Sequence, residues 1–218
     1  MLFRSGMNEV EVTELFERYG VLHTGHFKLS SGRHSDTYLQ CARILEHPRV
    51  AASLGEAIAH RYPGGADVVV SPALGGILIG NAVAYAIGCR FLFAERVAGA
   101  MTLRRGQQLR PGERVLVVED VITTGGSAAE VIELCEGAGA TVVGATVGAK
   151  VVGAKVVGVG ALVDRTEAPP PFHLEALLRV HARTWEEDAC PLCARGEPLH
   201  TPGSRGLSTP ASEKAPSP

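Results

Sequence analysis

Short apolar runs alternate with longer, helix-like stretches through the middle of the chain. Residues 67–71, 90–94 and 115–118 have the length and apolar character of buried strands. Residues 77–87 and 127–138 are longer, mostly apolar and bounded by glycine, as expected of helices that cover a sheet. This alternation predicts a right-handed, mainly parallel α/β fold.

Three further segments extend the pattern towards the two ends. Residues 9–19 place apolar side chains at near-helical spacing and predict an amphipathic opening helix that ends at Gly20. Apolar runs at 141–147 and 157–163 predict the remaining strands of the sheet. Residues 27–39 are polar and rich in turn formers, with Ser30-Ser31-Gly32 as the expected pivot of a turn.

Two segments depart from this rhythm. Residues 142–158 form an imperfect short repeat of Val, Gly, Ala and Lys, for which a lengthened strand pair or an insertion born of replication slippage is favoured over a functional element. Residues 194–218 are rich in Pro, Gly and Ser and contain no aromatic side chain. Because such a composition buries too little to offset its ordering entropy, we expect a disordered tail there.

Composition narrows the class of protein. Hydrophobic residues make up 45% of the chain and aromatic residues only 5%, which suits a parallel sheet covered by helices. The formal net charge of −2 gives no basic field for nucleic acid. The start of the chain has four glutamates and no signal-like apolar core, and the long apolar tract at 141–163 contains Lys150 and Lys155. We therefore expect no membrane span and a cytoplasmic location.

The five cysteines fall into two groups. Cys41, Cys89 and Cys135 stand alone in apolar or helical surroundings and are interpreted as small buried hydrophobes. Cys190 and Cys193 form one CxxC motif, which supplies half of a zinc site. Neither a second pair nor a neighbouring histidine completes it, so a structural metal there is expected to need ligands from another subunit.

The most informative stretch is VLVVEDVITTGGS at residues 115–127. A buried strand ends in Glu119 and Asp120, and a hydroxyl- and glycine-rich turn then leads into a helix. At the carboxyl end of a parallel strand, such a turn lies where α/β proteins bind ligands. Gly125 and Gly126 allow close approach of the backbone, and the free N–H groups of a helix start attract phosphate.

The two acids indicate which phosphorylated ligand is bound. A phosphate alone is repelled by carboxylates, whereas a phosphorylated sugar offers hydroxyls from which Glu119 and Asp120 can accept hydrogen bonds. The structural alternative is an ordinary capped strand–turn–helix. Two competing phosphate motifs fail, because Asn81 and Ala82 stand where a P-loop needs Lys and Ser or Thr, and no GxGxxG opens a helix.

These residues carry a family resemblance. VLVVEDVITTGGS resembles the signature that binds 5-phosphoribosyl 1-diphosphate (PRPP) in type I phosphoribosyltransferases. GHFKLSSGRHSDTYLQCA, VVSPALGGILIG, FAERVAGAMTLRRG, LVDR and the CPLC motif are similar to orotate phosphoribosyltransferases in particular. The resemblance implies a type I phosphoribosyltransferase fold over residues 1–193, with a small hood at about 8–45 and a core at about 46–193.

The resemblance also implies a set of site residues. Expected PRPP contacts are Ala73, Leu74, Gly75, Arg96, Glu119, Asp120, Val121, Ile122, Thr123, Thr124, Gly125, Gly126, Ser127 and Lys28. Expected orotate contacts are Thr123, Arg165, Tyr38 and Leu39. Expected catalytic residues are Arg96, Asp120, Arg104 and Arg105. A guanidinium fork such as that of Arg165 suits the carboxylate of orotate, although a surface arginine after a strand is the plain alternative.

Residues 96–110 contain four arginines and no acid. A solvated basic loop is one interpretation; the resemblance favours a mobile lid that neutralises the departing diphosphate and reaches the neighbouring subunit of a homodimer. Val97 and Ala100 stand where the family often has lysine, and a lid histidine is absent. Arg104 and Arg105 are expected to compensate.

The reaction implied is transfer of the phosphoribosyl group from PRPP to orotate, giving orotidine 5′-monophosphate and diphosphate in pyrimidine (UMP) biosynthesis. Mg²⁺ would arrive mainly on PRPP and water, because no cage of carboxylates is visible, and no protein metal site is expected. Two rivals stay open. A phosphoribosyltransferase for a purine base would keep the loop but lack Arg165 and the region Gly25–Ala42. A non-catalytic PRPP sensor would keep the loop without lid chemistry.

Overall fold

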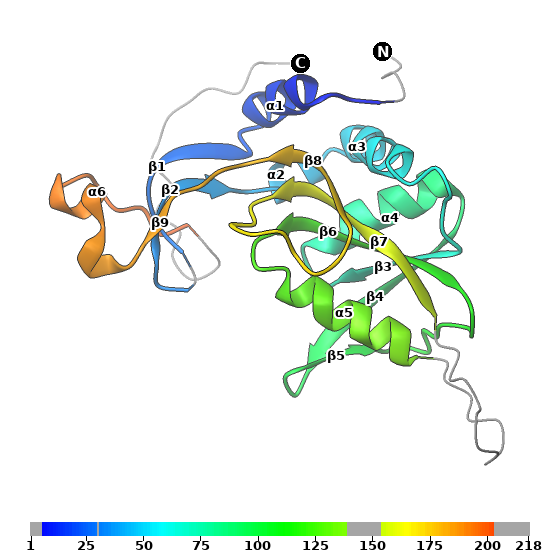
Figure 1. The fold of residues 1–218 in the computed structure, drawn as a ribbon. Coiled ribbons are helices and arrows are strands. Elements are labelled where there is room, and N and C mark those ends of the chain that lie inside the picture. The colour runs from blue at the N-terminus through cyan, green and yellow to red at the C-terminus, as the bar shows by residue number, and fades with distance from the viewer. Residues whose placement is uncertain (1–5, 30, 139–153, 203–218) are drawn as a thin grey trace. The chain divides into compact units, whose positions relative to one another are not determined.

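The structure is a computed structural model that describes residues 6–29, 31–138 and 154–202 (Figure 1). Contacts divide the chain into two units. The first comprises Met1–Val21 and Gln40–His181, and the second comprises Leu22–Leu39 and Ala182–Pro218. The hood and core boundaries expected from the sequence stay predictions.

A six-stranded sheet forms the centre of the first unit, in the order β5-β4-β3-β6-β7-β8. All neighbouring pairs are parallel except β4 and β5, which form an antiparallel hairpin. The strands are β3 (Val68–Pro72), β4 (Arg90–Val97), β5 (Ala100–Leu103), β6 (Arg114–Ile122), β7 (Lys155–Asp164) and β8 (Leu174–Arg179). The mainly parallel α/β fold predicted from the sequence is confirmed.

Helices cover both faces of this sheet. α3 (Pro48–His60) and α4 (Gly76–Ile87) pack on one face, and α5 (Gly126–Gly137) packs on the other (Figure 1). Under α5 lies an apolar core built from β-branched strand residues, including Val68, Val70, Val115, Val117 and Val159. Continuous apolar strands are what a sheet buried on both faces requires.

Local signals set the ends of several helices. α1 (Glu9–Arg18) begins at a capping box, in which the Asn8 side chain accepts from the Glu11 N–H and the Glu11 carboxylate accepts from the Asn8 N–H. α4 ends at Gly88, whose φ of 79° is the left-handed conformation that glycine adopts without steric cost. Helix α2 (Ala42–Leu45) is a single turn before α3. The predicted opening helix is therefore confirmed, whereas α3 is an addition to the predicted elements.

The second unit is a three-stranded antiparallel sheet in the order β1-β2-β9, formed by β1 (Leu22–Lys28), β2 (His34–Leu39) and β9 (Thr184–Trp185). A 3₁₀ turn (Glu187–Ala189) and a short helix α6 (Pro191–Ala194) follow. The turn predicted around residues 30–32 falls between β1 and β2, and the strands on either side of it are additions to the predicted elements. Polar side chains of this segment are buried in strands, which periodicity alone does not reveal.

The C-terminal segment contacts β1 through its backbone. The Lys28 N–H donates to the His200 carbonyl, and the His200 N–H donates to the His26 carbonyl, both at 2.8 Å. Residues 194–202 of the expected tail thus make defined contacts.

The rest of that tail and the predicted strand at 141–147 lie outside the described residues, whereas the strand predicted at 157–163 lies within β7. No described helix is long and apolar enough to cross a bilayer.

Candidate active site

The predicted site residues of the first unit gather at the carboxyl ends of neighbouring parallel strands. The turn after β3, the end of β4, the loop after β6 and the turn after β7 all lie at this edge of the sheet. The chain passes from β3 to β4 on one side and places β6 on the other side of β3. This edge between β3 and β6 is therefore the switch point at which α/β sheets bind ligands.

Two carboxylates stand where β6 ends. Glu119 and Asp120 are both partly buried, and burial is the main reason why their pKa values rise. Burial, followed by the neighbouring charge of Asp120, raises the pKa of Glu119 to about 7. The pair therefore lies in surroundings that disfavour two bare charges and favour hydrogen bonds from a ligand.

The loop after the acids leads directly into α5. Thr123 and Thr124 are exposed, and Gly125 has a φ of 75° with its backbone against Phe172. A Cβ added to Gly125 would lie 2.9 Å from the Phe172 ring, so both conformation and space require glycine. The first N–H groups of α5 lack acceptors within the helix, and the Gly126 N–H donates to Thr124 Oγ1 at 3.3 Å. N–H groups at such a helix start can bind an anion.

The turn after β3 touches the acidic pair. A Cβ added to Gly75 would lie 2.6 Å from Asp120 Oδ1, so the backbone of Gly75 passes directly beside this carboxylate. The Ala73 N–H donates to the Ala94 carbonyl at 2.8 Å, and the peptide between Ala73 and Leu74 is cis. The structure thus brings the expected diphosphate turn and the expected ribose-binding acids together.

Arg165 follows β7 and is joined to the same loop. Its N–H donates to the Ile122 carbonyl at 2.8 Å, and Ile122 pairs with Asp164 in the parallel register of β6 and β7. The base-binding arginine expected from the sequence is therefore held one strand away from the loop that contains Thr123.

The predicted lid begins as a hairpin, because residues 100–103 form β5 and pair with β4. Two of its arginines are already bound to carboxylates. Arg96 forms a two-pronged ion pair with Glu130 of α5 at 2.7 and 2.9 Å, and Arg105 contacts Glu95 at 3.1 Å. Arg104 is exposed and forms no ion pair with a described carboxylate. Sequence reasoning misses both carboxylate partners, because neither lies within the basic segment 96–110.

The remaining candidates belong to the second unit. Lys28 forms an ion pair with Glu187 at 3.0 Å, and the ring of Tyr38 lies near those of His23 and Phe27. Leu39 ends β2 and is partly buried. Their expected roles beside the loop of the first unit stay predictions.

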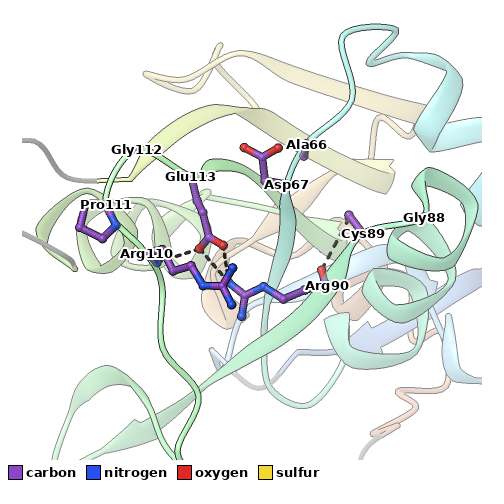
Figure 2. Close-up of a pocket in the computed structure, with 9 residues that line it drawn as sticks. All are labelled: Ala66, Asp67, Gly88, Cys89, Arg90, Arg110, Pro111, Gly112 and Glu113. Atoms are coloured by element: carbon purple, nitrogen blue, oxygen red, sulfur yellow. Dashed lines mark hydrogen bonds and ion pairs between the residues drawn. The ribbon is translucent and has the colours of Figure 1, made fainter.

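A pocket of about 710 Å³ opens at the opposite, amino ends of the strands (Figure 2). Arg90 and Glu113 occupy it as an ion pair with contacts of 2.5 and 2.7 Å, and Asp67 lies at its rim. Since the guanidinium there is already neutralised and the loop residues lie at the other edge, this pocket is not the candidate active site.

Comparison with known proteins agrees with this geometry. The phosphoribosyl transferase domain matches residues 40–170, which include β3 to β7 and every site residue of the first unit. An orotate phosphoribosyltransferase of Desulforamulus reducens is 46% identical over 205 residues, covering 93% of this chain and all of the relative.

The chain belongs to the orotate phosphoribosyltransferase family.

Another member, from Caldanaerobacter subterraneus subsp. tengcongensis, is 46% identical over 204 residues, 92% of this chain and all of that relative. The crystal structure of the Mycobacterium tuberculosis orotate phosphoribosyltransferase in complex with inorganic phosphate is 26% identical, with a TM-score of 0.55 over 78% of this chain and 95% of that one. The family and the type I phosphoribosyltransferase fold expected from the sequence are confirmed.

Proposed function

We propose that this protein transfers the 5-phosphoribosyl group of PRPP to orotate, releasing diphosphate and orotidine 5′-monophosphate for pyrimidine synthesis. The observation that carries the proposal is the junction of Glu119, Asp120 and the α5 N-terminus, with Gly75 against the carboxylate of Asp120. Relatives that share 46% of their residues with this chain are orotate phosphoribosyltransferases.

The loop after β6 would hold the sugar and its 5′-phosphate. Glu119 and Asp120 accept hydrogen bonds from the ribose hydroxyls, while Thr123, Thr124 and the N–H groups at the start of α5 bind the phosphate. Because hydroxyl donors favour the ionised acid, PRPP binding is expected to lower the raised pKa of Glu119 and to release a proton.

The diphosphate would lie against the Ala73–Gly75 turn, under the lid. Arg104 has no ion pair with a described carboxylate and extends towards solvent, so it is the arginine most readily available to the leaving group. As the C1–O bond to diphosphate breaks, its electron pair leaves with the diphosphate. Orotate N1 forms the new bond to C1 with the electron pair of its N1–H bond, and that proton passes to water or to the diphosphate. Arginine charge near the departing oxygen stabilises the transition state.

Mg²⁺ would bind at this site together with PRPP. Among the described residues, Glu119 and Asp120 supply the carboxylates at this loop. The group of side chains whose spacing could hold a metal ion lies in the second unit. We therefore assign Mg²⁺ binding mainly to the diphosphate and water, with Asp120 as the nearest protein carboxylate. When bound, the ion offsets the negative charge of the diphosphate.

The test is an assay of purified protein with PRPP, Mg²⁺ and orotate, followed by loss of orotate absorbance, and then the same assay with adenine, hypoxanthine, guanine and uracil. Conversion of orotate alone is the expected result. Conversion of a purine base instead would identify a purine phosphoribosyltransferase. PRPP binding without turnover of any base would identify a non-catalytic PRPP sensor.

The lid is tested in the same assay with R104A, R105A and the double variant. Arg104→Ala is expected to lower kcat by about 10–100-fold, because a cation near the leaving group is lost. Arg105→Ala is expected to have less effect, since its guanidinium is held by Glu95. Unchanged activity of the double variant removes both residues from the mechanism.

We also propose a homodimer with lids that reach the neighbouring site. Leu78 and Tyr85 are 53% and 81% exposed, and their spacing of seven residues puts them on one face of α4. Large apolar side chains exposed on one helix face favour a protein interface. Sedimentation of the wild type and of Tyr85→Glu tests this, with a shift to the monomer expected for the variant.

Finally, we propose that the enzyme works in the cytoplasm. All five cysteines are free thiols, as expected in a reducing compartment. Fractionation of the source cells with an antibody to the chain tests this location.

A further inference from the structure

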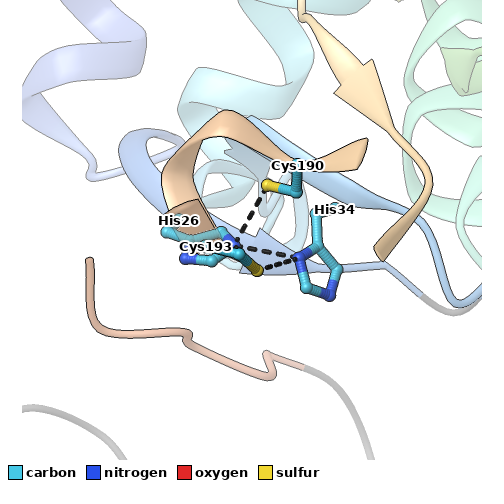
Figure 3. A group of neighbouring side chains, drawn as sticks. All are labelled: His26, His34, Cys190 and Cys193. Carbon is cyan, nitrogen blue, oxygen red and sulfur yellow. Dashed lines mark hydrogen bonds between the residues drawn. The ribbon is translucent and has the colours of Figure 1, made fainter. Parts of the chain in front are cut away.

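Four potential metal ligands converge in the second unit (Figure 3). His26 comes from β1, His34 from β2, and Cys190 and Cys193 from the start of α6. One ligand atom of each lies within 4.8 Å of all the others. The sequence analysis expects a metal at the CxxC motif to need ligands from another subunit, because no neighbouring histidine completes the motif. Two histidines that are distant in sequence instead lie beside both cysteines within the same chain.

The distances between these atoms match a tetrahedral site. Zinc bonds of about 2.3 Å to sulfur and about 2.0–2.1 Å to nitrogen place sulfur and nitrogen about 3.6 Å apart, and two nitrogens about 3.3 Å apart. Here, the Cys190 and Cys193 sulfurs lie 3.5 and 3.6 Å from His26 Nε2. Cys193 Sγ lies 3.2 Å from His34 Nδ1, and the two nitrogens are 3.0 Å apart.

The orientation of His26 favours metal binding. Its Nδ1 lies 2.9 Å from the Glu197 carbonyl, which can only accept, so Nδ1 carries the proton. In the neutral ring, the lone pair then sits on Nε2, and it is this atom that faces His34 and both sulfurs. A histidine that ligates a metal typically donates its other N–H to a backbone carbonyl in this way.

Burial of both histidines suits a structural metal. His26 is 2% exposed and His34 is fully buried, so little water reaches the two nitrogens that face the sulfurs. Without a metal, a proton on His34 Nδ1 joins the two nitrogens in one hydrogen bond across their 3.0 Å contact and leaves the sulfurs outside it. A cation between them satisfies both lone pairs together with both sulfurs.

We propose that His26, His34, Cys190 and Cys193 bind one structural Zn²⁺ ion per chain. Two thiolates and two imidazoles are a common set for structural zinc, and four protein ligands leave no open position for catalysis. The ion links the start of α6, which supplies both cysteines, to strands β1 and β2, which supply the two histidines. In a reducing compartment, a CxxC pair is more often a metal ligand than a disulfide.

Metal content of the full-length protein tests this directly. Purified under reducing conditions and dialysed against metal-free buffer, the wild type is expected to contain about one zinc per chain by elemental analysis. Cys193→Ser and His34→Ala are expected to lose it. His23→Ala, from the same strand as His26, and Cys89→Ser are the matched controls and should keep it. The readout does not involve transferase activity, so it stands apart from the proposed function.

Cobalt adds a geometric test that does not need a folded variant. Co²⁺ added to the metal-free wild type should give the visible absorption of a tetrahedral thiolate site, and a strong chelator should lower the melting temperature of the wild type but not of Cys193→Ser. Zinc-free protein that takes up neither metal overturns the proposal. A Cys190–Cys193 disulfide found by mass spectrometry in freshly isolated, alkylated protein also overturns it, in favour of a redox pair.

Discussion

The two units of the chain differ in what fills their interiors. In the first, fully buried side chains are mainly apolar, such as Leu116, Val117 and Leu162 in adjacent strands of the sheet. In the second, the described buried residues are mostly polar, with His26, His34, Ser35 and Thr37 against only Phe27, Cys190 and Leu192. One unit is stabilised by hydrophobic burial, and the other depends on specific polar contacts.

Hydrophobic burial and specific polar contacts serve different purposes in the two units. A close-packed sheet holds the acids, the turn after β3 and Arg165 in fixed register, which an active site requires. A small sheet with little apolar area needs another stabiliser, and structural metals often serve this purpose in small folded units.

Removing apolar bulk from the first unit should have the largest effect. Leu116→Ala is expected to lower the free energy of unfolding by about 2–5 kcal/mol, because a fully buried side chain leaves a cavity. Denaturant unfolding measures this, and the loss should be the same with and without a chelator. Val10→Ala, at a side chain 66% exposed, is the control. A loss below about 1 kcal/mol for Leu116→Ala would contradict the hydrophobic account.

The partly buried Glu119 of the first unit should make the stability of the protein depend on pH. The pKa of Glu119 rises from its ordinary 4.5 to about 7, mainly by burial and then by the charge of Asp120. Between these values the folded protein holds a proton that the unfolded chain has lost, so stability falls as pH rises through this window. The expected fall is about 1–3 kcal/mol.

Unfolding of the ligand-free wild type and of Glu119→Gln at several pH values checks this effect. The variant should lose most of the slope and keep only what Asp120 adds, because burial raises that pKa as well. An identical slope in the two proteins would exclude Glu119 as its source.

Adding one methyl group at Gly75, at the carboxyl edge of the sheet, should lower activity without lowering the free energy of unfolding. Gly75→Ala places a Cβ where Asp120 Oδ1 now lies, and the carboxylate must move. We expect kcat/KM for PRPP to fall by about tenfold, equivalent to about 1.4 kcal/mol. Gly137→Ala is the matched control, because a Cβ there meets nothing within 4 Å. Equal activity of the two variants would mean that the contact between turn and acid is unimportant.

An exposed ion pair in the second unit should matter least. Lys28 and Glu187 have side chains 37% and 65% exposed, and such surface pairs contribute about 0–1 kcal/mol. Glu187→Gln should therefore change the melting temperature little, in contrast to loss of a cluster ligand. A large destabilisation by Glu187→Gln would show that ion pairs, rather than a metal, hold this unit together.

The sequence predicts the first unit well because its strands are continuous apolar runs with glycine at their ends. Residues 115–118 and 157–163 lie inside β6 and β7, and the acids near the end of β6 and the glycines after it identify the loop by their order along the chain. The pattern does not single out α3, although Val50, Leu54 and Ile58 have helical spacing along its buried face. Its close approach to α4, where Gly55 meets Ala82, depends on tertiary packing.

The second unit is predicted poorly for a physical reason. Its strands carry His, Ser and Thr, whose burial depends on partners distant in sequence, so no local period reveals them. His26 and His34 join Cys190 and Cys193 only after the chain has folded. The ion pairs of Arg96 and Arg105 are of the same kind, since their acidic partners lie outside the basic segment and charge alone does not choose between partners.

The pairing of Arg96 with Glu130 has a consequence for the catalytic cycle. Both side chains are about two-fifths exposed, so the pair is weak and easily exchanged. If Arg96 contacts PRPP, as the family resemblance implies, the incoming anion displaces Glu130, and departure of the product lets that carboxylate return. Under that condition, Glu130 would hold the guanidinium of Arg96 in place while the site is empty and would yield it readily to a bound anion.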